Sequence, residues 1–255
     1  MQAYNDSFSR VFNNEFSSFS KRVTPYLINY YEAHQGNLET TNVLDLCCGA
    51  GHLANGFLNK GYHVVGVDGS KGMVQCFIKN NSKYIEQGQA VIIEDDITNF
   101  RTDEQFGLVV STYDSINHLE NERVLNSCLN SVYKLLIEGG LFIFDLNTRL
   151  ALLNWNKVCV TENEYLLMVS KGIYDGVGEK AVIRFSGFSK LTCDSYERFD
   201  QIIVNTVFKF DRVRALMLKI GWKNVYFAKI DDLSIPVSDP EKENEENRIF
   251  IVAHK

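Results

Sequence analysis

Apolar and polar residues alternate along the first 150 positions in blocks that predict short buried strands and amphipathic helices in turn. Five apolar runs have the length and composition of strands, and most are followed by polar or glycine-containing turns. They cover residues 43–46, 62–67, 90–93, 106–111 and 141–144. The helical spacing is clearest after the fourth run, where Val124, Cys128, Leu129, Val132 and Leu135 share one face. Strands that alternate with helices predict a parallel sheet wound on both sides, with right-handed crossovers.

The pattern changes beyond Arg149. Three long β-rich stretches cover 164–174, 179–191 and 196–207 and are separated by turn residues, which predicts an antiparallel sheet. Helical spacing returns at 213–220, and the final strands are expected at 223–229 and 248–253. The acidic run 239–247 is expected to be a solvated loop. The predicted fold class is α/β: a doubly wound, seven-stranded, mostly parallel sheet with its last strand antiparallel and an antiparallel β-sheet inserted after strand five.

The N-terminal region carries an aromatic stripe. Its members, Tyr4, Phe8, Phe12, Phe16 and Phe19, recur every three or four residues, as on one face of an amphipathic helix. Such a helix could fold over the site as a lid or simply pack in the core. Thr24 is expected to cap the following helix, with Pro25 as its first residue.

We therefore expect three parts. Residues 1–23 form an N-terminal lid segment, residues 24–148 and 208–255 form the ligand-binding domain, and residues 149–207 form the antiparallel insertion. The insertion would serve as a substrate lid or as a dimerisation surface, because exposed strands can pair with a second copy.

Composition narrows the class of partner. The 255 residues carry a net charge of −6 and no long basic stripe, which disfavours nucleic acid as a partner. No segment approaches the roughly 20 apolar residues that a membrane span needs, and no signal peptide is expected. The six cysteines lack the paired spacing of a metal site, so we expect no metal and a reduced, cytoplasmic protein.

The segment 42–53 is the most informative one, because it combines a buried strand, a glycine turn and the start of a helix. Gly49 and Gly51 lack the Cβ that would keep the backbone away from a ligand. Asp45 ends the apolar run, where a carboxylate suits a cation or a hydroxyl and repels a phosphate. The spacing Gly49-x-Gly51-x-x-Ala54 also fits a dinucleotide fingerprint with alanine at its third glycine, so the turn alone leaves a nicotinamide or flavin site open.

Further aspartates follow the next two strands. Asp68 can accept hydrogen bonds from both hydroxyls of a ribose, although an Asp-Gly-Ser turn also explains it. Asp96 could accept from an adenine amino group, with Ile97 as an apolar wall, or it could belong to a solvated turn.

Five segments in this order resemble the successive motifs of the Rossmann-like (class I) methyltransferases that use S-adenosylmethionine. They are 43–53, 64–73, 92–100, 106–119 and 138–148. Residues 113–118 and 145–148 are most similar to the small-molecule members with an antiparallel insertion. The sequence departs from the family at Cys47, where glycine is more usual, and at Gly107, where aspartate is common.

The resemblance implies that the cofactor is S-adenosylmethionine and its product S-adenosylhomocysteine. The residues it implies for cofactor binding are Asp45, Cys47, Gly49, Gly51, Asp68, Gly69, Met73, Asp96, Ile97, Thr112 and Tyr4. The implied acceptor loop follows strand four and contains Tyr113, Asp114, Asn117 and His118. Asp145 and Asn147, expected just after strand five, are second-rank candidates, and Trp155 could line a substrate wall or fill a seam.

Methyl transfer from a sulfonium requires alignment and exclusion of water more than covalent catalysis. Asp114 or His118 could take a proton from an amine or a hydroxyl, although His118 and Asn117 could instead be helix-entry residues bonded to the backbone. The leading hypothesis is a methyltransferase for a small-molecule acceptor, with an amine as one candidate, and a possible homodimer formed through the insertion. The alternatives are a nicotinamide-dependent oxidoreductase and a non-catalytic protein that binds S-adenosylmethionine on the same scaffold.

Overall fold

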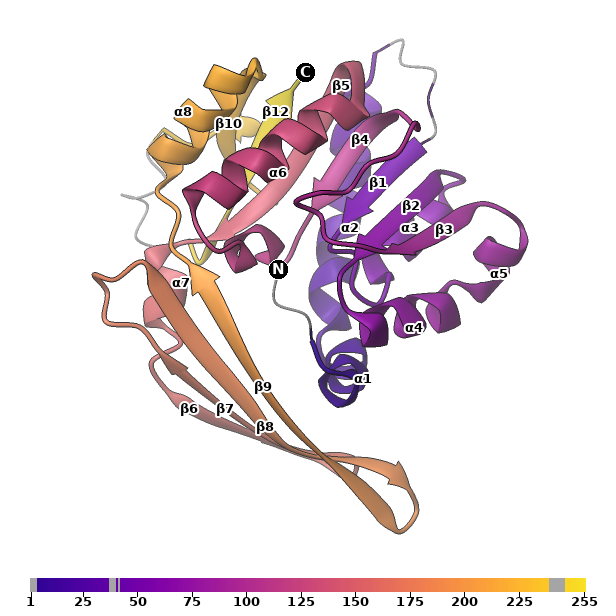
Figure 1. Ribbon diagram of the computed structural model, residues 1–255, viewed down its shortest axis with the longest axis vertical. Coiled ribbons are helices and arrows are strands. Elements are labelled where there is room, and N and C mark those ends of the chain that lie inside the picture. Colours follow the sequence, from indigo (N-terminus) through magenta and orange to yellow (C-terminus); the bar gives the residue numbers. More distant parts are fainter. Residues whose placement is uncertain (1–3, 37–39, 41, 239–245) are drawn as a thin grey trace.

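The described residues form two sheets, and the larger one carries the parallel core (Figure 1). The computed structural model describes residues 4–36, 40, 42–238 and 246–255. The strands of the large sheet lie in the order β11-β10-β12-β5-β4-β1-β2-β3. Their bounds are β1 (Asn42–Leu46), β2 (His63–Asp68), β3 (Ala90–Glu94), β4 (Phe106–Ser111), β5 (Leu136–Asn147), β10 (Lys223–Lys229), β11 (Asp232–Pro236) and β12 (Arg248–His254). Strands β1 to β5 are parallel, whereas β12 is antiparallel to both β5 and β10.

Helices cover both faces of this sheet. They are α2 (Ser17–His34), α3 (His52–Asn59), α4 (Lys71–Asn80), α5 (Ser82–Glu86), α6 (Glu122–Leu135) and α8 (Phe210–Ile220). Leu44 packs in one core cluster with side chains of α6 and α8, whereas Val43 packs in another with side chains of α2 and α3. Because alternate residues of β1 point to opposite faces and both faces are covered, the strand is apolar after its first residue, Asn42, apart from Asp45.

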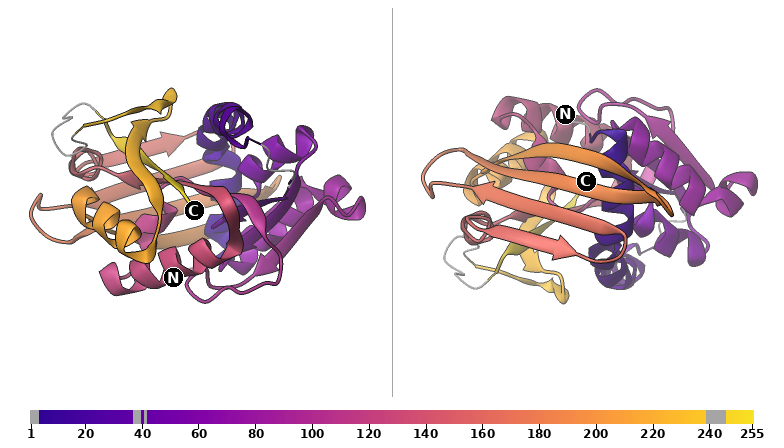
Figure 2. Two further views of the ribbon diagram at one scale, coloured as in Figure 1. Left: turned by 90° about the horizontal axis from the view of Figure 1, so that it is seen from above. Right: turned by 90° about the horizontal axis from the view of Figure 1, so that it is seen from below.

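The second sheet is antiparallel and has four strands, which Figure 2 shows beneath the core. They are β6 (Val158–Glu162), β7 (Leu166–Ile173), β8 (Lys180–Thr192) and β9 (Ser195–Thr206), and α7 (Arg149–Leu153) leads into them. The α/β class and the inserted antiparallel sheet are confirmed. Strand β6 lay outside the predicted β-rich stretches; its residues are all exposed, so no buried stripe marks it.

Three boundary predictions were wrong. The large sheet has eight strands rather than seven, because β11 adds a short edge strand in which Leu233 alone is buried. Strand β5 extends to Asn147 because β12 pairs with it along 141–147, so Asp145 and Asn147 lie within the strand rather than after it.

The third error concerns Thr24 and Pro25, which lie inside α2 rather than at its start. The Thr24 hydroxyl donates to the Ser20 carbonyl oxygen at 2.6 Å, as serine and threonine do within helices. Val23, Leu27 and Tyr31 are buried against the sheet, and this packing stabilises a continuous helix despite the missing N–H of proline.

The N-terminal helix α1 (Asp6–Glu15) joins the two sheets. Its Phe8 and Val11 form one cluster with Leu166, Phe199 and other side chains of the second sheet. On its other side, α1 packs tightly against α4: a Cβ at Gly72 would lie 2.7 Å from the Ser9 hydroxyl oxygen. Asn5 caps the helix and also bonds to Gln201 of β9.

This contact predicts the effect of Gly72→Ala. Alanine favours a helix more than glycine does, so any loss of stability must come from overpacking against α1. Overpacking of this kind costs about 1–3 kcal/mol. We expect faster proteolysis within residues 4–16 and a lower unfolding temperature. The double variant Gly72→Ala with Ser9→Gly removes the nearest atoms and should recover part of the loss. An unchanged proteolysis rate in the single variant would contradict the tight docking of α1.

Candidate active site

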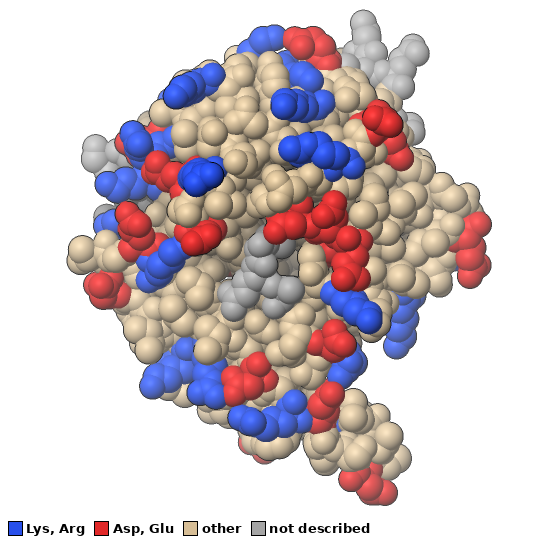
Figure 3. All heavy atoms as spheres, viewed as in Figure 1, with Lys and Arg blue, Asp and Glu red and all other residues tan. Residues whose placement is uncertain are grey.

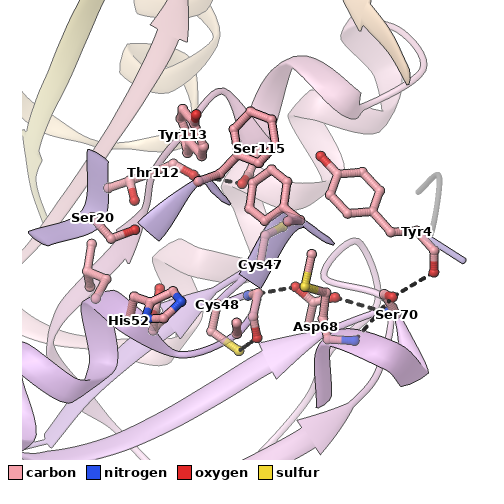
Figure 4. A pocket seen from close by; sticks show the side chains of 18 of the residues that line it. Tyr4, Ser20, Cys47, Cys48, His52, Asp68, Ser70, Thr112, Tyr113 and Ser115 are labelled. Atoms are coloured by element: carbon pink, nitrogen blue, oxygen red, sulfur yellow. Dashed lines mark hydrogen bonds between the residues drawn. The ribbon is translucent and has the colours of Figure 1, made fainter. Parts of the chain in front are cut away.

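A pocket opens at the carboxyl ends of β1, β2 and β4, where open α/β sheets bind ligands. It holds about 790 Å³ of empty space, part of it open to solvent. Figure 4 shows side chains from the N-terminal segment, the glycine turn and the loop after β4 around it. The lining residues are Tyr4, Phe12, Phe16, Ser20, Asp45, Cys47, Cys48, Gly49, Ala50, His52, Leu53, Asp68, Gly69, Ser70, Met73, Thr112, Tyr113, Ser115 and His118.

The turn after β1 has the backbone geometry that the glycines predict. Cys47, Gly49 and Gly51 all have positive φ, at 56°, 53° and 75°. Cys47 therefore adopts the left-handed conformation that the more usual glycine would favour. Gly51 does not line the pocket; a Cβ there would lie 2.4 Å from both Phe77 and Asn81, so this glycine serves close packing.

Asp68 holds the turn in place from the end of β2. Its Oδ2 accepts a hydrogen bond from Gly49 N at 2.9 Å and its Oδ1 accepts from Ser70 N at 2.9 Å (Figure 4). Burial raises the pKa of Asp68 to about 6, against the effect of these two N–H groups. Each oxygen retains a lone pair, so the carboxylate can still accept from a ligand's hydroxyls.

Asp45 is the unsatisfied group of the pocket. It is 2 % exposed, and its Oδ2 has no hydrogen-bond partner among the described residues. Burial raises its pKa to about 8; Asp68 adds to the rise, and the N–H of Ala54 opposes it. A buried carboxylate oxygen without a donor is costly. The pocket therefore fits a ligand that brings a cation to Asp45, such as the ammonium of S-adenosylmethionine.

A second cavity adjoins the first, and side chains from α1 and from the second sheet line it. Its empty space is about 840 Å³, a volume that includes the opening of the cavity. Its walls are Tyr4, Phe12, Phe16, Tyr113, Asp114, His118, Asn147, Trp155, Ile183, Phe185, Ile203 and Arg248. Tyr4, Phe12, Phe16, Tyr113 and His118 line both cavities, so the two meet at these side chains. We call the second one the acceptor cavity.

His118 is the buried base at this junction. It ends the short 3-10 helix η1 (Ser115–His118), and its Nε2 lies 3.9 Å from Asp114 Oδ2. Burial lowers the pKa of His118 below its usual value; Asp114 opposes that shift and Arg248 adds to it. The imidazole is therefore neutral near pH 7 and can accept a proton.

The structure brings most, but not all, of the predicted site residues together. Of the predicted cofactor residues, Gly51, Asp96 and Ile97 do not line the cofactor pocket. The Asp96 carboxylate accepts from Thr98 N and from the Thr98 hydroxyl, and it borders a neighbouring cavity with Gly69, Glu94 and Asp95. Ile97 is 1 % exposed and packs in the core.

Two of the predicted acceptor-site residues, Asn117 and Asp145, have their polar atoms bonded within the protein. Asn117 is fully buried, donates to Thr206 O at 2.9 Å and accepts from Asn147 N at 3.0 Å, so it joins the two sheets. Asp145 is also fully buried and accepts hydrogen bonds from the N–H groups of Tyr113 and Asp114. Neither lines the acceptor cavity, whereas Tyr113, Asp114, His118, Asn147 and Trp155 do.

Sequence reasoning missed several lining residues. Phe12 and Phe16 were in the aromatic stripe, and Ser70 follows Asp68 in a turn that caps α4, so local signals existed for them. His52 and Arg248 carried no local signal. Arg248 begins β12, and it is separated in the sequence by more than 100 residues from the two aspartates to which it donates hydrogen bonds.

Basic and acidic side chains are mixed over the face in Figure 3. Among the described residues, no cluster of His, Cys, Asp and Glu could hold a metal ion. Nor does any helix in this part of the chain have the length and apolar character to cross a membrane.

Comparisons with known proteins agree with this geometry. Residues 43–140 match the family described as a methyltransferase domain. A putative methyltransferase of Bacillus subtilis is 24 % identical over 222 residues, covering 85 % of each chain. A solved S-adenosylmethionine-dependent methyltransferase from Clostridium acetobutylicum has a TM-score of 0.79 at 20 % identity, covering 97 % of each chain. The S-adenosylmethionine-bound amino pentose methyltransferase of Micromonospora echinaspora has a TM-score of 0.67 at 13 % identity, covering 100 % of this chain and 98 % of that one.

Residues 43–140 of this chain therefore match a methyltransferase domain, and the fold of the whole chain is similar to that of solved S-adenosylmethionine-dependent methyltransferases.

The raised pKa of Asp45 predicts how cofactor affinity depends on pH. Below about pH 8, Asp45 is protonated in the free protein. An ammonium group beside Asp45 favours its carboxylate form, so binding of the cofactor releases a proton. Affinity for S-adenosylhomocysteine, measured by titration calorimetry, should rise between pH 6 and 8 by up to about tenfold per unit.

Two controls isolate this effect. Asp45→Asn should bind more weakly and lose the rise between pH 7 and 8. 5′-Methylthioadenosine lacks the ammonium and should show the weakest dependence on Asp45. A wild-type affinity that is constant from pH 6 to 8 would exclude Asp45 as the ammonium partner.

Proposed function

We propose that this protein is a Rossmann-like, class I methyltransferase that transfers the methyl group of S-adenosylmethionine to an amine nitrogen of a small molecule. The observation that carries the proposal is the acceptor cavity, where Asp114 and His118 face a space walled by aromatic rings next to the cofactor pocket. Aromatic faces and a carboxylate both attract a cation. The cavity is covered by α1 and the second sheet, which favours a small acceptor over a macromolecule.

The roles we propose for the cofactor residues follow the carboxylates of the pocket. Asp45 accepts from the ammonium, Asp68 from the ribose hydroxyls, and Met73 packs beside them. The adenine end lies beyond Gly69, which lines both the cofactor pocket and the cavity beside Asp96. Bound S-adenosylmethionine supplies a methyl group whose bond to sulfur breaks, with the electron pair going to sulfur, as the acceptor nitrogen's lone pair forms the new bond.

His118 takes the proton that an amine must lose before its lone pair can attack. The imidazole is neutral near pH 7 because burial lowers its pKa. Asp114 attracts the ammonium form of the acceptor into the cavity, and the aromatic walls exclude water from the nitrogen. The similarity of the fold to that of a solved sugar N-methyltransferase from Streptoalloteichus, with a TM-score of 0.69 at 16 % identity, supports a nitrogen acceptor.

Two finer features belong to the same proposal. We place the protein in the cytoplasm and expect a homodimer formed through the second sheet. Val158, Val160 and Ile173 are exposed on that sheet, which supports pairing of two copies. Light scattering of the purified protein decides the oligomeric state.

A panel of small molecules tests the acceptor class. Purified protein with S-adenosylmethionine should methylate members of an amine panel, detected by mass spectrometry as the gain of one methyl group. Phenols and carboxylic acids of similar size are the comparison. Turnover confined to phenols or acids would overturn the amine assignment, and cofactor binding without turnover in any panel would favour a non-catalytic protein.

Asp68→Ala tests the ribose assignment. Two hydrogen bonds to a charged group contribute about 1.5–3 kcal/mol each, so the loss should weaken S-adenosylhomocysteine binding at least about 100-fold. Asp103→Ala changes an exposed carboxylate that lines neither the cofactor pocket nor the cavity beside Asp96, and it serves as the control. Because Asp68 also holds Gly49 and Ser70, thermal unfolding must be recorded in parallel, and normal affinity in a folded Asp68→Ala protein would rule out the role.

His118→Gln tests the base. We expect kcat to fall about 100-fold or more, because general base catalysis contributes at least this factor. Cofactor affinity should change by no more than a few fold, since the amide keeps a polar side chain of similar length. The acid limb of the pH profile for kcat should also disappear. A variant that retains wild-type kcat and pH profile would show that the acceptor loses its proton without His118.

A further inference from the structure

Arg248 occupies an unusual place for a cation. It is the first residue of β12, lines the acceptor cavity and has a side chain that is 17 % exposed. Its guanidinium carbon lies 4.8 Å from the ring centre of Phe19 and 5.2 Å from that of Tyr113. These two rings are stacked with centroids 4.5 Å apart. Burial disfavours the charge, but Asp145 and Asp114 outweigh it and raise the pKa of Arg248 above its usual value.

The same guanidinium binds both carboxylates of the acceptor loop region. Nη1 donates to Asp145 Oδ1, and Nη2 donates to Asp114 Oδ1 at 2.8 Å. Asp145 in turn accepts from the N–H groups of Tyr113 and Asp114, each at 2.7 Å. Asp145 thus holds the backbone of the turn at residues 113 and 114, and Arg248 holds the side chain of Asp114. We call Arg248 and Asp145 the clamp.

That turn is strained and needs such a clamp. Tyr113 and Asp114 have consecutive positive φ values of 65° and 53°, which residues with a Cβ rarely adopt. Strained backbone of this kind persists only where the surrounding structure holds it. Without the clamp, the turn would relax and the Asp114 carboxylate would change its direction.

The geometry leaves one oxygen for the acceptor. Asp114 Oδ1 is bound to Arg248, whereas Oδ2 lies 3.9 Å from His118 Nε2, and both residues line the acceptor cavity. One guanidinium faces two carboxylates, so the group retains a net negative charge. A cationic acceptor nitrogen therefore fits beside Asp114 Oδ2, within reach of the neutral imidazole.

We propose that Arg248 is the positioning residue of the acceptor nitrogen site, holding Asp114 so that one carboxylate oxygen faces the nitrogen beside His118. The identity of the acceptor in this inference rests on the proposed function, whereas the geometry around Arg248 does not depend on it. Arg248 also occupies Asp114 Oδ1 with a hydrogen bond, so that oxygen is not available to the acceptor. It also repels a proton on His118, which keeps the imidazole free to accept one.

The first experiment needs neither acceptor nor cofactor. Amide hydrogen exchange of residues 113 and 114 is compared in wild type, Arg248→Met and Arg248→Lys. In Arg248→Met the protection factors of these two amides should fall by at least about tenfold, because the turn opens locally. In Arg248→Lys part of the protection should return. The matched control is Arg184→Met, which removes an arginine paired with an aspartate, Asp200, on the second sheet. Equal protection in all four proteins would overturn the proposal.

The pKa of His118, followed by NMR titration of its imidazole, separates positioning from general stability. Losing the positive charge of Arg248 should raise the pKa of His118, and Arg248→Lys should return it toward the wild-type value. A general loosening of the fold would move the other histidines as well. A His118 pKa that is the same in Arg248→Met and wild type would contradict the proposal.

Kinetics with an amine from the panel complete the test. Arg248→Met should lower kcat by about 30-fold or more and leave cofactor affinity within a few fold, since misplacing a reacting group by about 1 Å costs on the order of 100-fold. Arg248→Lys should recover most of the rate. If Arg248→Met does not fold because Asp145 is left without its cation, the lysine variant, which keeps a positive charge beside Asp145, provides the comparison with wild type.

Failure of the two proposals can be told apart. If no amine is methylated, the proposed acceptor class is wrong. The hydrogen-exchange and titration experiments still test whether Arg248 holds the turn, because they need no acceptor. If amines are methylated but Arg248→Met matches wild type in kcat and in protection, Arg248 has no positioning role.

Discussion

Buried carboxylates at the carboxyl edge of one sheet, and the donors they require, shape the whole site. Asp45, Asp68 and Asp145 lie near the ends of β1, β2 and β5, and all are buried. Each accepts hydrogen bonds from backbone N–H groups of a neighbouring turn or helix. Because a buried carboxylate without donors is costly, the backbone must bring N–H groups to it. Two of the resulting turns contain residues with positive φ. The exception is Asp45 Oδ2, which lacks a partner among the described residues and so marks where a cationic ligand belongs.

The sequence was sufficient for those parts of the fold that depend on local pattern. Strand β4 was predicted at its observed bounds, and the other parallel strands were found because apolar runs buried on both faces are continuous. Asp45, Asp68 and the loop after β4 followed from their positions at strand ends. Exposed strands such as β6 and β11 bury too little to leave a pattern, which is why they escaped detection.

Features that depend on distant contacts were out of reach. Arg248 and Asp145 are paired through the antiparallel register of β12 on β5, which no local spacing reveals. For the same reason Asp145 was taken for a substrate residue, whereas its oxygens hold the backbone of the acceptor loop. Thr24 and Pro25 have the local signature of a helix start, but packing of α2 against the sheet overrides it.

The N-terminal helix ties the two cavities together. The Tyr4 carbonyl oxygen accepts from the Ser70 hydroxyl at 2.8 Å beside the cofactor pocket, while Asn5 bonds to Gln201 of the second sheet. Phe12 and Phe16 contribute to both cavities from the same helix and its end. Opening α1 would therefore expose the cofactor pocket and the acceptor cavity together, so one docking event can exclude water from both.

The junction of the cavities also decides which group can act as the base. Burial raises the pKa of Tyr4 well above its usual value and that of Tyr113 to about 12, so both phenols stay protonated and cannot accept a proton near pH 7. Asp114 is committed to Arg248 through one oxygen, and phenylalanine rings have no proton acceptor. His118, kept neutral by burial, is the remaining group among the five that line both cavities. An acceptor whose nitrogen must lose a proton at this junction therefore has one partner for it, and that partner lies beside the carboxylate that attracts the nitrogen.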